Sequence, residues 1–329
     1  MAVFTPVDPP EAAAFLADYD LGALLEFQGI SEGVSNSNFR IVTEAGAYVL
    51  TLFEAVTPEA DLPYFMDLTR YLAAAGYPAP APITDRRGQV LRPLNGRTAA
   101  LIAWLPGAWP RDPDPATVAA CARALAQMHR VCDGFSGRRA NSMGPDAWAR
   151  LSARSQQRAH SALADLLADL DQERAYLQRV WSLDLPTGTV HGDYFPDNVL
   201  MTPDGAVGGV IDFYYACTDR LAYDLAIALN AWGFTPGGQP LPWVQQTFLE
   251  AYAAERPLSE AERSALPDLC RAAALRFTLS RLHDWLWHDP AWLVQPKDPE
   301  AFYRRLHYFR SQEAVAHLQQ GSRPLSLQA

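Results

Sequence analysis

The sequence predicts an α+β fold of two lobes, in which a small antiparallel β lobe precedes a larger, mostly helical lobe. Short runs rich in β-branched and aromatic residues dominate the N-terminal third, and such runs are typical of strands. Three prolines within residues 109–115 indicate a connector, and beyond it apolar residues recur at helical spacing. Because single hydrophobic cores stop growing at roughly 250–300 residues, we place two lobes at residues 1–105 and 106–329.

The small lobe is predicted from changes of periodicity along the chain. Residues 11–26 have helical character, and the pattern then changes to strand-like runs separated by turn residues. A helix follows the third run, with Asp61 placed to cap its start and Gly76 placed to end it. The resulting order βββαββ describes a compact lobe. The predicted strands lie at residues 25–30, 39–43, 48–53, 89–92 and 98–104.

The second lobe is predicted to be helical, with two short strands. Amphipathic stripes run through residues 118–128 and 163–181. The strands lie at residues 189–190 and 207–213, and helices resume from Ala222 to the C-terminus. The helical run is broken at residues 233–242, 256–259 and 289–299.

Charge and composition exclude several classes of protein. With 37 acidic and 27 basic residues the formal charge is −10, so the chain lacks the basic surface that nucleic-acid binding needs. No apolar stretch approaches the roughly 18 residues of a membrane span, and the N-terminus has no signal-peptide pattern. The four cysteines lack metal-site or disulfide spacing, which favours the reducing cytoplasm. Of the 27 basic residues only Lys297 is a lysine.

The residues that indicate chemistry are gathered in two neighbouring segments. The segment TVHGDYFPDNVLM holds His191, Asp193 and Asn198, and Asp212 follows on the next predicted strand. Phosphoryl transfer needs positioning and charge neutralisation more than covalent help, so one carboxylate can orient and deprotonate the acceptor hydroxyl. An Asn amide oxygen and an Asp carboxylate are hard ligands of the kind that Mg²⁺ prefers. The four-residue spacer lets the loop return, so that Asp193 and Asn198 face one cavity.

Each fragment also has a plainer interpretation. His-Gly-Asp alone is a turn tripeptide, and an Asp-Asn pair often only caps turns. The fragments occur together, however, with the expected strands, the four-residue spacer and a second Asp between Ile and Phe. This combination favours a kinase-type site.

At these residues the sequence resembles the aminoglycoside phosphotransferase and choline kinase-like superfamily, a branch of the protein-kinase-like fold. The resemblance covers nearly the whole chain and is most specific over residues 191–232. It implies an ATP- and Mg²⁺-dependent enzyme with a nucleotide-binding N-terminal lobe and a catalytic, acceptor-binding C-terminal lobe. Within the superfamily the resemblance is to homoserine kinases, which implies phosphorylation of L-homoserine to O-phospho-L-homoserine in threonine biosynthesis. The segments that carry it are GISEGVSNSNFRI, YVLTLFE, HGDYFPDNV, GVIDFYYACTDRLAYDLAIALNAW and ALRFTLSRLHDW.

The resemblance also implies roles for individual residues. Asp193 would be the catalytic base, and Asn198 and Asp212 would be the magnesium ligands. His191 would shape the catalytic loop. Asp224 would brace that loop from a helix start, where N-cap chemistry independently favours Asp.

The nucleotide loop is predicted between the first two strands, in the run GISEGVSNSN. This run is not the G-x-G-x-x-G cover of protein kinases, and a plain hairpin turn is an equally good interpretation. Its small residues would still let backbone N–H groups approach an anion. Adenine would pair with backbone groups of the hinge between the lobes, from Ala103 to Leu105. The predicted nucleotide-binding residues of the loop are Gly33, Ser35, Asn36, Ser37 and Asn38.

The third predicted strand lacks the lysine that protein kinases place there. The chain has YVLTLFE, with Thr51 at or next to that position, and Lys297 lies far away in a Pro-rich C-terminal segment. This absence motivates a second hypothesis, a non-catalytic nucleotide-binding scaffold. The complete acceptor and metal set, and the Leu-Thr-Leu implied for the homoserine kinases, favour an active enzyme. Arg40 and Arg70 are candidates to replace the charge, and either is equally well a solvated surface group.

The acceptor site is predicted from the groups that homoserine presents. A carboxylate favours the fork of an arginine, and an ammonium favours carboxylates or aromatic faces. If residues 271–288 form one helix, Arg281 and Asp284 share a face, although a surface salt bridge explains that pair equally well. A choline, aminoglycoside or fructosamine kinase would use the same chemistry on another acceptor, and His129 is predicted to be a packed histidine. The predicted substrate residues are Tyr194, Tyr214, Asp219, Arg276, Arg281 and Asp284.

Overall fold

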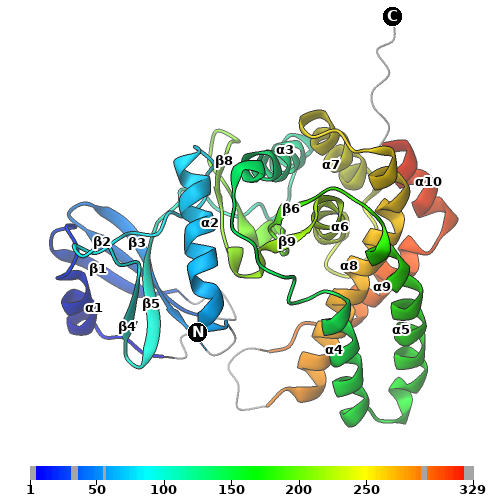
Figure 1. The fold of residues 1–329 in the computed structure, drawn as a ribbon, viewed down its shortest axis with the longest axis horizontal. Coiled ribbons are helices and arrows are strands. Elements are labelled where there is room, and N and C mark those ends of the chain that lie inside the picture. Colours follow the sequence, from blue (N-terminus) through cyan, green and yellow to red (C-terminus); the bar gives the residue numbers. More distant parts are fainter. Residues whose placement is uncertain (1–4, 31–35, 55–56, 290–294, 322–329) are drawn as a thin grey trace, which may run out of the picture.

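The computed structural model describes residues 5–30, 36–54, 57–289 and 295–321. Two lobes lie side by side, with the sheet of the small lobe at one end and the helices of the large lobe at the other (Figure 1). This arrangement confirms the predicted α+β class, with a β lobe that precedes a helical lobe.

The small lobe is a five-stranded antiparallel sheet with one helix on each face. The strands pair in the order β1-β2-β3-β5-β4, and α2 follows β3, which confirms the predicted order βββαββ. The elements are α1 (Pro9–Leu16), β1 (Leu24–Gly29), β2 (Ser37–Thr43), β3 (Gly46–Phe53), α2 (Leu62–Ala74), β4 (Leu91–Leu94) and β5 (Arg97–Ala103).

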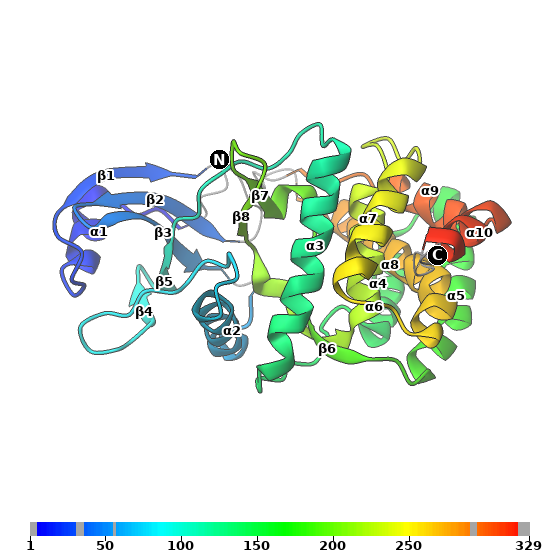
Figure 2. The same ribbon diagram turned by 90° about the horizontal axis from the view of Figure 1, so that it is seen from above.

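The two faces of this sheet have different partners. Ile41 and Leu50 belong to the cluster that α1 covers, whereas Ile102 packs against Phe65 of α2. Because side chains alternate along a strand, Thr51 lies on the α2 face of the sheet. Figure 2 shows α2 at the junction between the sheet and the large lobe. The α2 face is therefore the one that adjoins the second lobe.

The first helix is shorter than predicted. It ends at Leu16, so the predicted helix over residues 11–26 is wrong beyond that residue. Gly22 adopts a φ of +73°, which a continuing helix does not contain. From Leu24 the backbone pairs with β2. Pairing with the next strand therefore outweighs the local helical pattern.

The start of α2 is held by a contact between the lobes. Asp61 occupies the predicted N-cap position, but its side chain forms no capping hydrogen bond. Its carboxylate instead lies 2.7 Å from Nη2 of Arg139 in the large lobe. The Arg139 guanidinium also lies 4.9 Å from the ring centroid of Phe65. Charge and stacking therefore fix α2 relative to the large lobe.

The large lobe consists of helices around two short antiparallel ladders, β6 with β9 and β7 with β8. The sequence predicted only the strands that became β6 and β8. The other two are three and four residues long, and β9, with the sequence CTDR, has no apolar run to mark it. The elements are α3 (Pro115–Val131), α4 (Pro145–Arg158), α5 (Ala164–Leu177), β6 (Thr187–Val190), β7 (Val199–Met201), β8 (Val207–Val210), β9 (Cys217–Arg220), α6 (Leu221–Trp232), α7 (Pro242–Glu255), α8 (Glu260–Trp287), α9 (Glu300–Phe309) and α10 (Gln312–Gly321).

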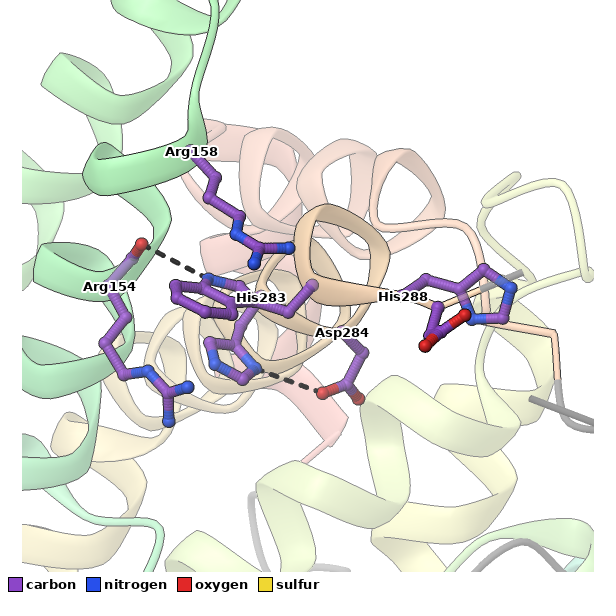
Figure 3. Close-up of a pocket in the computed structure, with 7 residues that line it drawn as sticks. Arg154, Arg158, His283, Asp284 and His288 are labelled. Atoms are coloured by element: carbon purple, nitrogen blue, oxygen red, sulfur yellow. Dashed lines mark hydrogen bonds and ion pairs between the residues drawn. The ribbon is translucent and has the colours of Figure 1, made fainter. Parts of the chain in front are cut away.

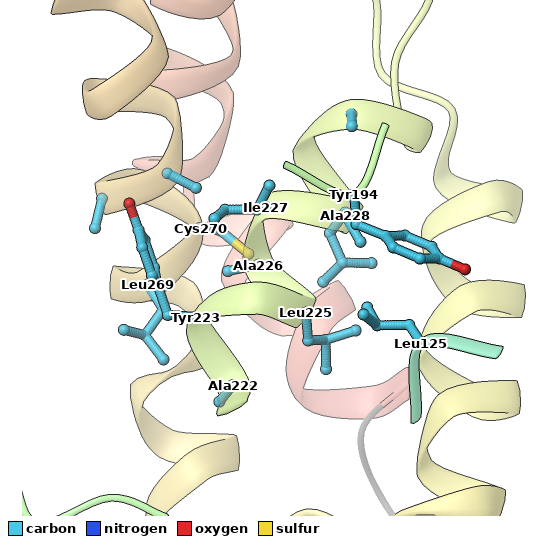
Figure 4. Packing of buried hydrophobic residues seen from close by; sticks show 14 of the residues in the cluster. Leu125, Tyr194, Ala222, Tyr223, Leu225, Ala226, Ile227, Ala228, Leu269 and Cys270 are labelled. Carbon is cyan, nitrogen blue, oxygen red and sulfur yellow. The ribbon is translucent and has the colours of Figure 1, made fainter. Parts of the chain in front are cut away.

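The core of the large lobe is built around α6. All twelve residues of this helix are buried, which is expected of a helix that is apolar on every side. Figure 4 shows Leu225 and Ile227 of α6 between side chains of neighbouring helices, among them Leu125 of α3 and Cys270 of α8. Because β9 leads directly into α6, the strands that carry the site are anchored on the best-buried helix.

The predicted helix breaks at residues 233–242 and 256–259 are confirmed, and the third, at residues 289–299, lies partly outside the described residues. Ser259 and Glu262 form a capping box at the start of α8. Within the described ranges, the helices include none that is long and apolar enough to cross a membrane.

Candidate active site

The catalytic loop leaves β6 through a sharp turn at Gly192, whose φ is +76°. A Cβ on this residue would lie 2.7 Å from the carbonyl oxygen of Tyr215, so glycine is required on steric grounds as well. The turn buries His191 completely and leaves Asp193 only partly buried. The carboxylate of Asp193 is therefore the part of the loop that can meet an acceptor.

Asp224 holds this loop from behind. Its Oδ2 accepts the N–H of His191 at 2.7 Å, and its Oδ1 accepts the N–H of Gly192 at 2.8 Å. Its Oδ2 also lies 2.9 Å from Nε2 of His129. Burial acts to raise the pKa of Asp224, but the two histidines and these hydrogen bonds hold the pKa below its usual range. Asp224 lies in the first turn of α6 rather than at the cap, which is Arg220.

This support continues through His129 to the far side of the lobe. Nδ1 of His129 lies 2.7 Å from the hydroxyl of Tyr252, which also accepts a hydrogen bond from Arg256 at 3.4 Å. Arg256 in turn pairs with Glu262 at 2.8 Å. The prediction of a packed histidine is confirmed, because His129 is buried and both ring nitrogens have partners. A chain of hydrogen bonds therefore connects the catalytic loop to α7 and α8.

The ring of His191 ties the loop to the end of β8. Its Nδ1 accepts the N–H of Asp193 at 3.2 Å, and its Nε2 donates to the carbonyl oxygen of Ile211 at 2.9 Å. This pattern requires a neutral ring that carries its proton on Nε2. Burial lowers the pKa of His191, which keeps the ring neutral. His191 thus has the geometry expected of a residue that shapes the loop.

Asp193, Asn198 and Asp212 meet in front of the loop. Nδ2 of Asn198 donates to the carbonyl oxygen of Asp193 at 2.8 Å and lies 3.5 Å from its Oδ2. The carbonyl oxygen of Asn198 accepts the N–H of Ile211 at 3.0 Å, which places the next residue, Asp212, beside it. Asp212 has a φ of +62°, a conformation that non-glycine residues adopt mostly at functional sites. The structure therefore brings the three predicted residues together.

The two carboxyl groups in front of the loop are short of compensating charge. Burial raises the pKa of Asp193 to about 6. Burial, together with the negative charges of Asp193 and Asp197, raises the pKa of Asp212 to about 7. Such shifts are typical of functional acids that face one another without a cation. The pair is therefore suited to a bound divalent cation.

Mg²⁺ fits this donor set. It needs only one or two carboxylates and an amide oxygen, because it keeps waters and substrate phosphate oxygens in the rest of its octahedron. Nδ2 of Asn198 is turned to Asp193, which leaves Oδ1 of Asn198 for an ion. In the part of the chain that the structure describes, no group of three or more His, Cys, Asp or Glu side chains could hold a metal alone.

The predicted nucleotide loop is described only at its C-terminal end. Gly33 and Ser35 lie outside the described residues. Asn36 and Ser37 are both bound to Glu54, which follows β3. The Asn36 Oδ1 accepts the Glu54 N–H at 3.2 Å, and the Ser37 Oγ donates to the Glu54 Oε1 at 2.8 Å. These contacts fix the end of the loop on the sheet.

The place of the missing lysine is taken by a polar pair. Oγ1 of Thr51 donates to Oδ1 of Asn38 at 2.8 Å, between β3 and β2. Both side chains are uncharged, so this pair supplies no positive charge to a nucleotide.

Both arginines suggested as replacements for that lysine have an acidic partner. Arg40 pairs with Glu26 at 2.7 Å, and Arg70 pairs with Asp67 at 3.4 Å. Both pairs are partly exposed. The interpretation as solvated surface groups is therefore favoured for both arginines.

Two N–H groups of the predicted hinge are already used within the protein. The N–H of Ala103 donates to Ala81 at 2.9 Å, and the N–H of Trp104 donates to Ala47 at 3.2 Å. Among the described residues the N–H of Leu105 has no such acceptor. Of the three predicted hinge positions, Leu105 is thus the one whose N–H the described backbone does not use.

Two arginines of α8 lie near the catalytic loop. Nη1 of Arg276 donates to the carbonyl oxygen of Gly192, and its buried Nε has no hydrogen-bond partner among the described residues. Nη1 of Arg281 donates to the carbonyl oxygen of Asp298 at 3.2 Å. Both positive charges act to lower the pKa of Asp193, against the larger effect of burial.

Arg281 and Asp284 do not form the surface salt bridge that was the alternative for them. Asp284 lies 3.2 Å from Nδ1 of His283, and Arg281 forms no ion pair with any described residue. The Arg281 guanidinium lies 4.4 Å from the ring centroid of Phe302, and burial lowers its pKa. A partly buried guanidinium without a carboxylate partner is suited to an anionic ligand.

Two predicted acceptor residues belong to the support of the site instead. Tyr194 is fully buried, and its hydroxyl donates to the carbonyl oxygen of Cys121 at 2.8 Å. Both carboxylate oxygens of Asp219 are engaged, one by Asn141 at 2.6 Å and the other by Arg220 at 3.1 Å. Neither side chain can turn to a substrate without breaking these contacts.

Tyr215 lies beside Arg276, whereas the predicted Tyr214 contacts the small lobe. The ring of Tyr214 packs edge-on against Phe53 of the small lobe, with centroids 5.4 Å apart. The Arg276 guanidinium lies 5.4 Å from the ring centroid of Tyr215, and burial and the charge of Asp193 raise the pKa of Tyr215 to about 12. Sequence reasoning missed Tyr215, because the left-handed residue and 3₁₀ turn before it follow no strand or helix period.

A cavity of about 510 Å³ lies beside the C-terminal half of α8 (Figure 3). Asp284 and His283 lie on its wall. The guanidinium groups of Arg154 and Arg158 lie 4.7 and 3.8 Å from the ring centroid of Trp287, which also lines the cavity. Asp284 is thus the predicted acceptor residue that the structure places at an open cavity.

Comparison with known proteins gives the family. Residues 26–261, which span both lobes, match the model of the phosphotransferase enzyme family. The chain belongs to this family. A homoserine kinase of Caulobacter sp. (strain K31) is 45% identical over 313 residues, which are 94% of this chain and 97% of the relative. A homoserine kinase of Gluconacetobacter diazotrophicus is 45% identical over 318 residues, 96% of this chain and 99% of the relative. These relatives confirm the resemblance to homoserine kinases.

A solved structure confirms the fold. The amicoumacin kinase hAmiN aligns with a TM-score of 0.70 at 16% identity, over 95% of this chain and 94% of that one. At this identity the likeness concerns the fold alone. The predicted protein-kinase-like arrangement of a sheet lobe and a helical lobe is therefore confirmed.

Proposed function

We propose that this protein transfers the γ-phosphoryl group of ATP to the hydroxyl group of L-homoserine. The observation that carries the proposal is the 45% identity to homoserine kinases over nearly the full length of both chains. The arrangement of Asp193, Asn198 and Asp212 supports it. A non-catalytic scaffold is disfavoured, because binding alone gives no reason to keep two partly buried acids with raised pKa values.

The proposed step is an in-line displacement at the γ-phosphorus atom. The hydroxyl oxygen of homoserine forms the new P–O bond. The bond from the γ-phosphorus to the β,γ-bridging oxygen breaks, and ADP leaves with its electron pair. Asp193 accepts the hydroxyl proton, so the products are O-phospho-L-homoserine, ADP and a proton. A carboxyl with a pKa of about 6 is ionised at neutral pH and still basic enough for this task.

Asn198 and Asp212 are the residues that would hold Mg²⁺. When bound, the ion neutralises charge on the β- and γ-phosphates of ATP. Asn198 has a second task, because its amide nitrogen holds the backbone of Asp193. The turn at Gly192 and the carboxylate of Asp224 keep the same loop in place from behind. The protein's own contribution is thus to orient Asp193 before the acceptor arrives.

The acceptor is proposed to be an amino acid, because the acceptor side carries arginines rather than a cluster of acids. Arg281, which has no carboxylate partner among the described residues, would take the carboxylate of homoserine. Asp284 and Tyr215 are the candidates for its ammonium group. Choline and aminoglycosides are cations, and guanidinium groups at the acceptor would repel them.

An ATP-turnover assay with a panel of acceptors tests the proposal. The panel contains L-homoserine, choline, an aminoglycoside and a fructosamine, each with and without Mg²⁺. We expect Mg²⁺-dependent turnover with L-homoserine. Turnover with another acceptor alone would assign a different kinase activity, and nucleotide binding without turnover on any acceptor would support the scaffold.

We also propose a cytoplasmic location. The four cysteines are free thiols in buried positions, as suits a reducing compartment. Burial raises the pKa of Cys121 to about 12, which keeps that thiol unreactive.

A further inference from the structure

One arginine joins the two lobes at the start of α2. Arg139 belongs to the connection between α3 and α4, and its side chain is 9% exposed. Its Nε and Nη2 both donate to Oδ2 of Asp61, at 2.9 and 2.7 Å. Its Nη1 donates to the carbonyl oxygen of Ala216 at 3.1 Å. Of the ion pairs between described residues, this one alone crosses from the small lobe to the large lobe.

On the large-lobe side, this contact adjoins the segment that follows Asp212. Ala216 ends that segment and lies directly before β9. The backbone of Arg139 is itself fixed to β9, because its carbonyl oxygen accepts the N–H of Thr218 at 2.7 Å. The partner of β9 is β6, the strand that leads into the catalytic loop. The guanidinium is therefore held by the same strands that carry the proposed catalytic residues.

On the small-lobe side, the contact holds the N-terminal half of α2, which Figure 1 shows between the sheet and the large lobe. The Arg139 guanidinium lies 4.9 Å from the ring centroid of Phe65. Phe65 in turn packs edge-on against Tyr214, with centroids 5.7 Å apart. Phe65 and Asp212 also line one small cavity of about 20 Å³. This half of α2 therefore lies against the proposed metal ligand.

Arginine is suited to this place, because its planar fork can donate to a carboxylate and to a carbonyl oxygen while its face stacks on a ring. The compact ammonium of a lysine could not make all three contacts at once. Another polar contact of α2 lies at the other end of the helix, where the Tyr71 hydroxyl donates to the carbonyl oxygen of Val131 at 3.1 Å. It carries no charge and does not reach the residues next to Asp212.

We propose that Arg139 is a positioning residue for ATP, which holds the small lobe where the nucleotide loop and Asp212 can meet the same nucleotide. The inference rests on the proposed function. ATP has to contact both lobes, because Asn38 of the predicted loop belongs to β2 and the proposed metal ligands belong to the large lobe. Arg281, the proposed partner of the homoserine carboxylate, belongs to the large lobe alone. Loss of Arg139 should therefore weaken nucleotide binding and leave acceptor binding unchanged.

The alternative is that Arg139 only adds stability. Apolar contacts between the lobes, such as that of Tyr214 with Phe53, would then be enough to place the sheet. In that case the loss of Arg139 lowers the free energy of unfolding and changes neither Michaelis constant. The two cases therefore differ in the KM for ATP.

The kinetic test compares Arg139→Gln and Arg139→Lys with Arg271→Gln. Arg271 is a matched control, because its side chain is 15% exposed and also donates twice to one carboxylate, that of Glu173, at 2.7 and 2.9 Å. That pair joins α8 to α5 within the large lobe. The KM for ATP is measured at saturating L-homoserine and the KM for L-homoserine at saturating ATP, and thermal unfolding gives the stability of each variant.

We expect Arg139→Gln to raise the KM for ATP about 10-fold, as for the loss of a hydrogen-bonded charge, and to leave the KM for L-homoserine unchanged. Arg139→Lys should recover part of the loss, because an ammonium can still pair with Asp61. Arg271→Gln should lose stability and keep its KM for ATP. An unchanged KM for ATP in Arg139→Gln, an equal rise of both KM values, or the same rise in Arg271→Gln would overturn the proposal.

Asp61→Asn tests the same contact from the small lobe and keeps the test decisive if Arg139→Gln does not fold. The Asp61 side chain is partly exposed and forms no capping hydrogen bond, and Asn is favourable at a helix start. The KM for ATP should rise about threefold, and the double variant should be no worse than Arg139→Gln, because both residues act through one contact. An unchanged KM for ATP in Asp61→Asn, or additive effects of the two substitutions, would contradict the proposal.

Calorimetric titration with AMP-PNP and Mg²⁺ needs no acceptor and separates this proposal from the proposed function. If homoserine is not phosphorylated, but Arg139→Gln binds AMP-PNP about 10-fold more weakly than the unchanged protein, then only the acceptor is wrong. If homoserine is phosphorylated and Arg139→Gln binds AMP-PNP as tightly as the unchanged protein, then only the role of Arg139 is wrong.

Discussion

Asp224 and Asp212 lie on opposite sides of the catalytic loop, and their surroundings shift the pKa values of their carboxyl groups in opposite directions. Asp224 accepts two backbone N–H groups and faces His129, and its pKa lies below the usual range. Asp212 faces other acids, and burial with their charges raises its pKa to about 7. The comparison teaches that support and chemistry are divided between the two sides of one loop.

The hydrogen bonds behind the loop stabilise it and so allow acids with raised pKa values to face one another in front of it. Acids that repel one another in a buried place destabilise the folded state and persist only where the surrounding structure holds them. Here Asp224 and Arg276 bond the backbone of the loop, and Gly192 gives it the required turn. The comparison predicts that variants behind the loop mainly change stability, whereas variants in front of it mainly change turnover.

The largest effect is expected for Asp193→Asn, in front of the loop. The amide cannot accept the hydroxyl proton, so kcat should fall by about 10²–10⁴, the usual contribution of a general base. Affinity for AMP-PNP should be retained, because Asn198 and Asp212 are untouched. Steady-state kinetics and nucleotide titration by calorimetry measure the two quantities. Near-normal turnover in this variant would remove Asp193 from the mechanism.

Asp224→Ala should have the largest effect on stability. It leaves the N–H groups of His191 and Gly192 buried without an acceptor, so the free energy of unfolding should fall by about 3–5 kcal/mol. The matched control is Asp67→Ala, which breaks the exposed pair with Arg70 and should cost about 0–1 kcal/mol. Urea unfolding measures both, and equal losses would contradict the supporting role of Asp224.

Asp212→Asn should change the free energy of unfolding in the opposite direction. It removes a carboxylate that is short of counter-charge, so the protein without metal or nucleotide should gain on the order of 1 kcal/mol of stability. Mg²⁺-dependent nucleotide binding should be lost at the same time. Thermal unfolding with and without Mg²⁺ and AMP-PNP compares the two states. A destabilised ligand-free variant would show that Asp212 is satisfied within the protein.

The same carboxyl predicts a pH dependence for the ligand-free protein. The pKa of Asp212 is about 7 in the folded state against an ordinary value of 3.8, so between these values the folded state binds more protons than the unfolded chain. Stability should therefore fall as pH rises through this window. The fall should be smaller in Asp212→Asn, and urea midpoints at several pH values measure it. Identical pH profiles would contradict the raised pKa.

The smallest effects are expected for the arginines once considered as replacements for the missing lysine. Arg40→Ala and Arg70→Ala break partly exposed pairs, so each should cost about 0–1 kcal/mol of stability. Neither should change kcat, because neither charge is a main influence on Asp193 or Asp212. A large loss of kcat in Arg40→Ala would place the missing positive charge on β2.

The sequence was sufficient to predict site residues that lie close together in the chain. Asp193, Asn198 and Asp212 were predicted because a short spacer and two adjacent strands bring them together. Tyr194 was expected at the acceptor but is fully buried, because whether a side chain after a motif points to the core or to the cleft depends on the local turn. The assignment of Tyr214 stays a prediction.

Contacts between distant elements could not be predicted. Asp61 was expected to cap α2, but it pairs with Arg139, a residue of the other lobe. Such contacts follow from how the lobes and helices pack, and a single sequence carries no periodic signal for that.

The most direct test of the account is phosphorus NMR of a reaction that contains the protein, Mg²⁺, ATP and L-homoserine. The account predicts that the γ-phosphate signal of ATP is replaced by that of a phosphate monoester, identified as O-phospho-L-homoserine by mass spectrometry. It also predicts no such conversion with Asp193→Asn. Absence of the monoester with the unchanged protein, or equal yields from both proteins, would contradict the account.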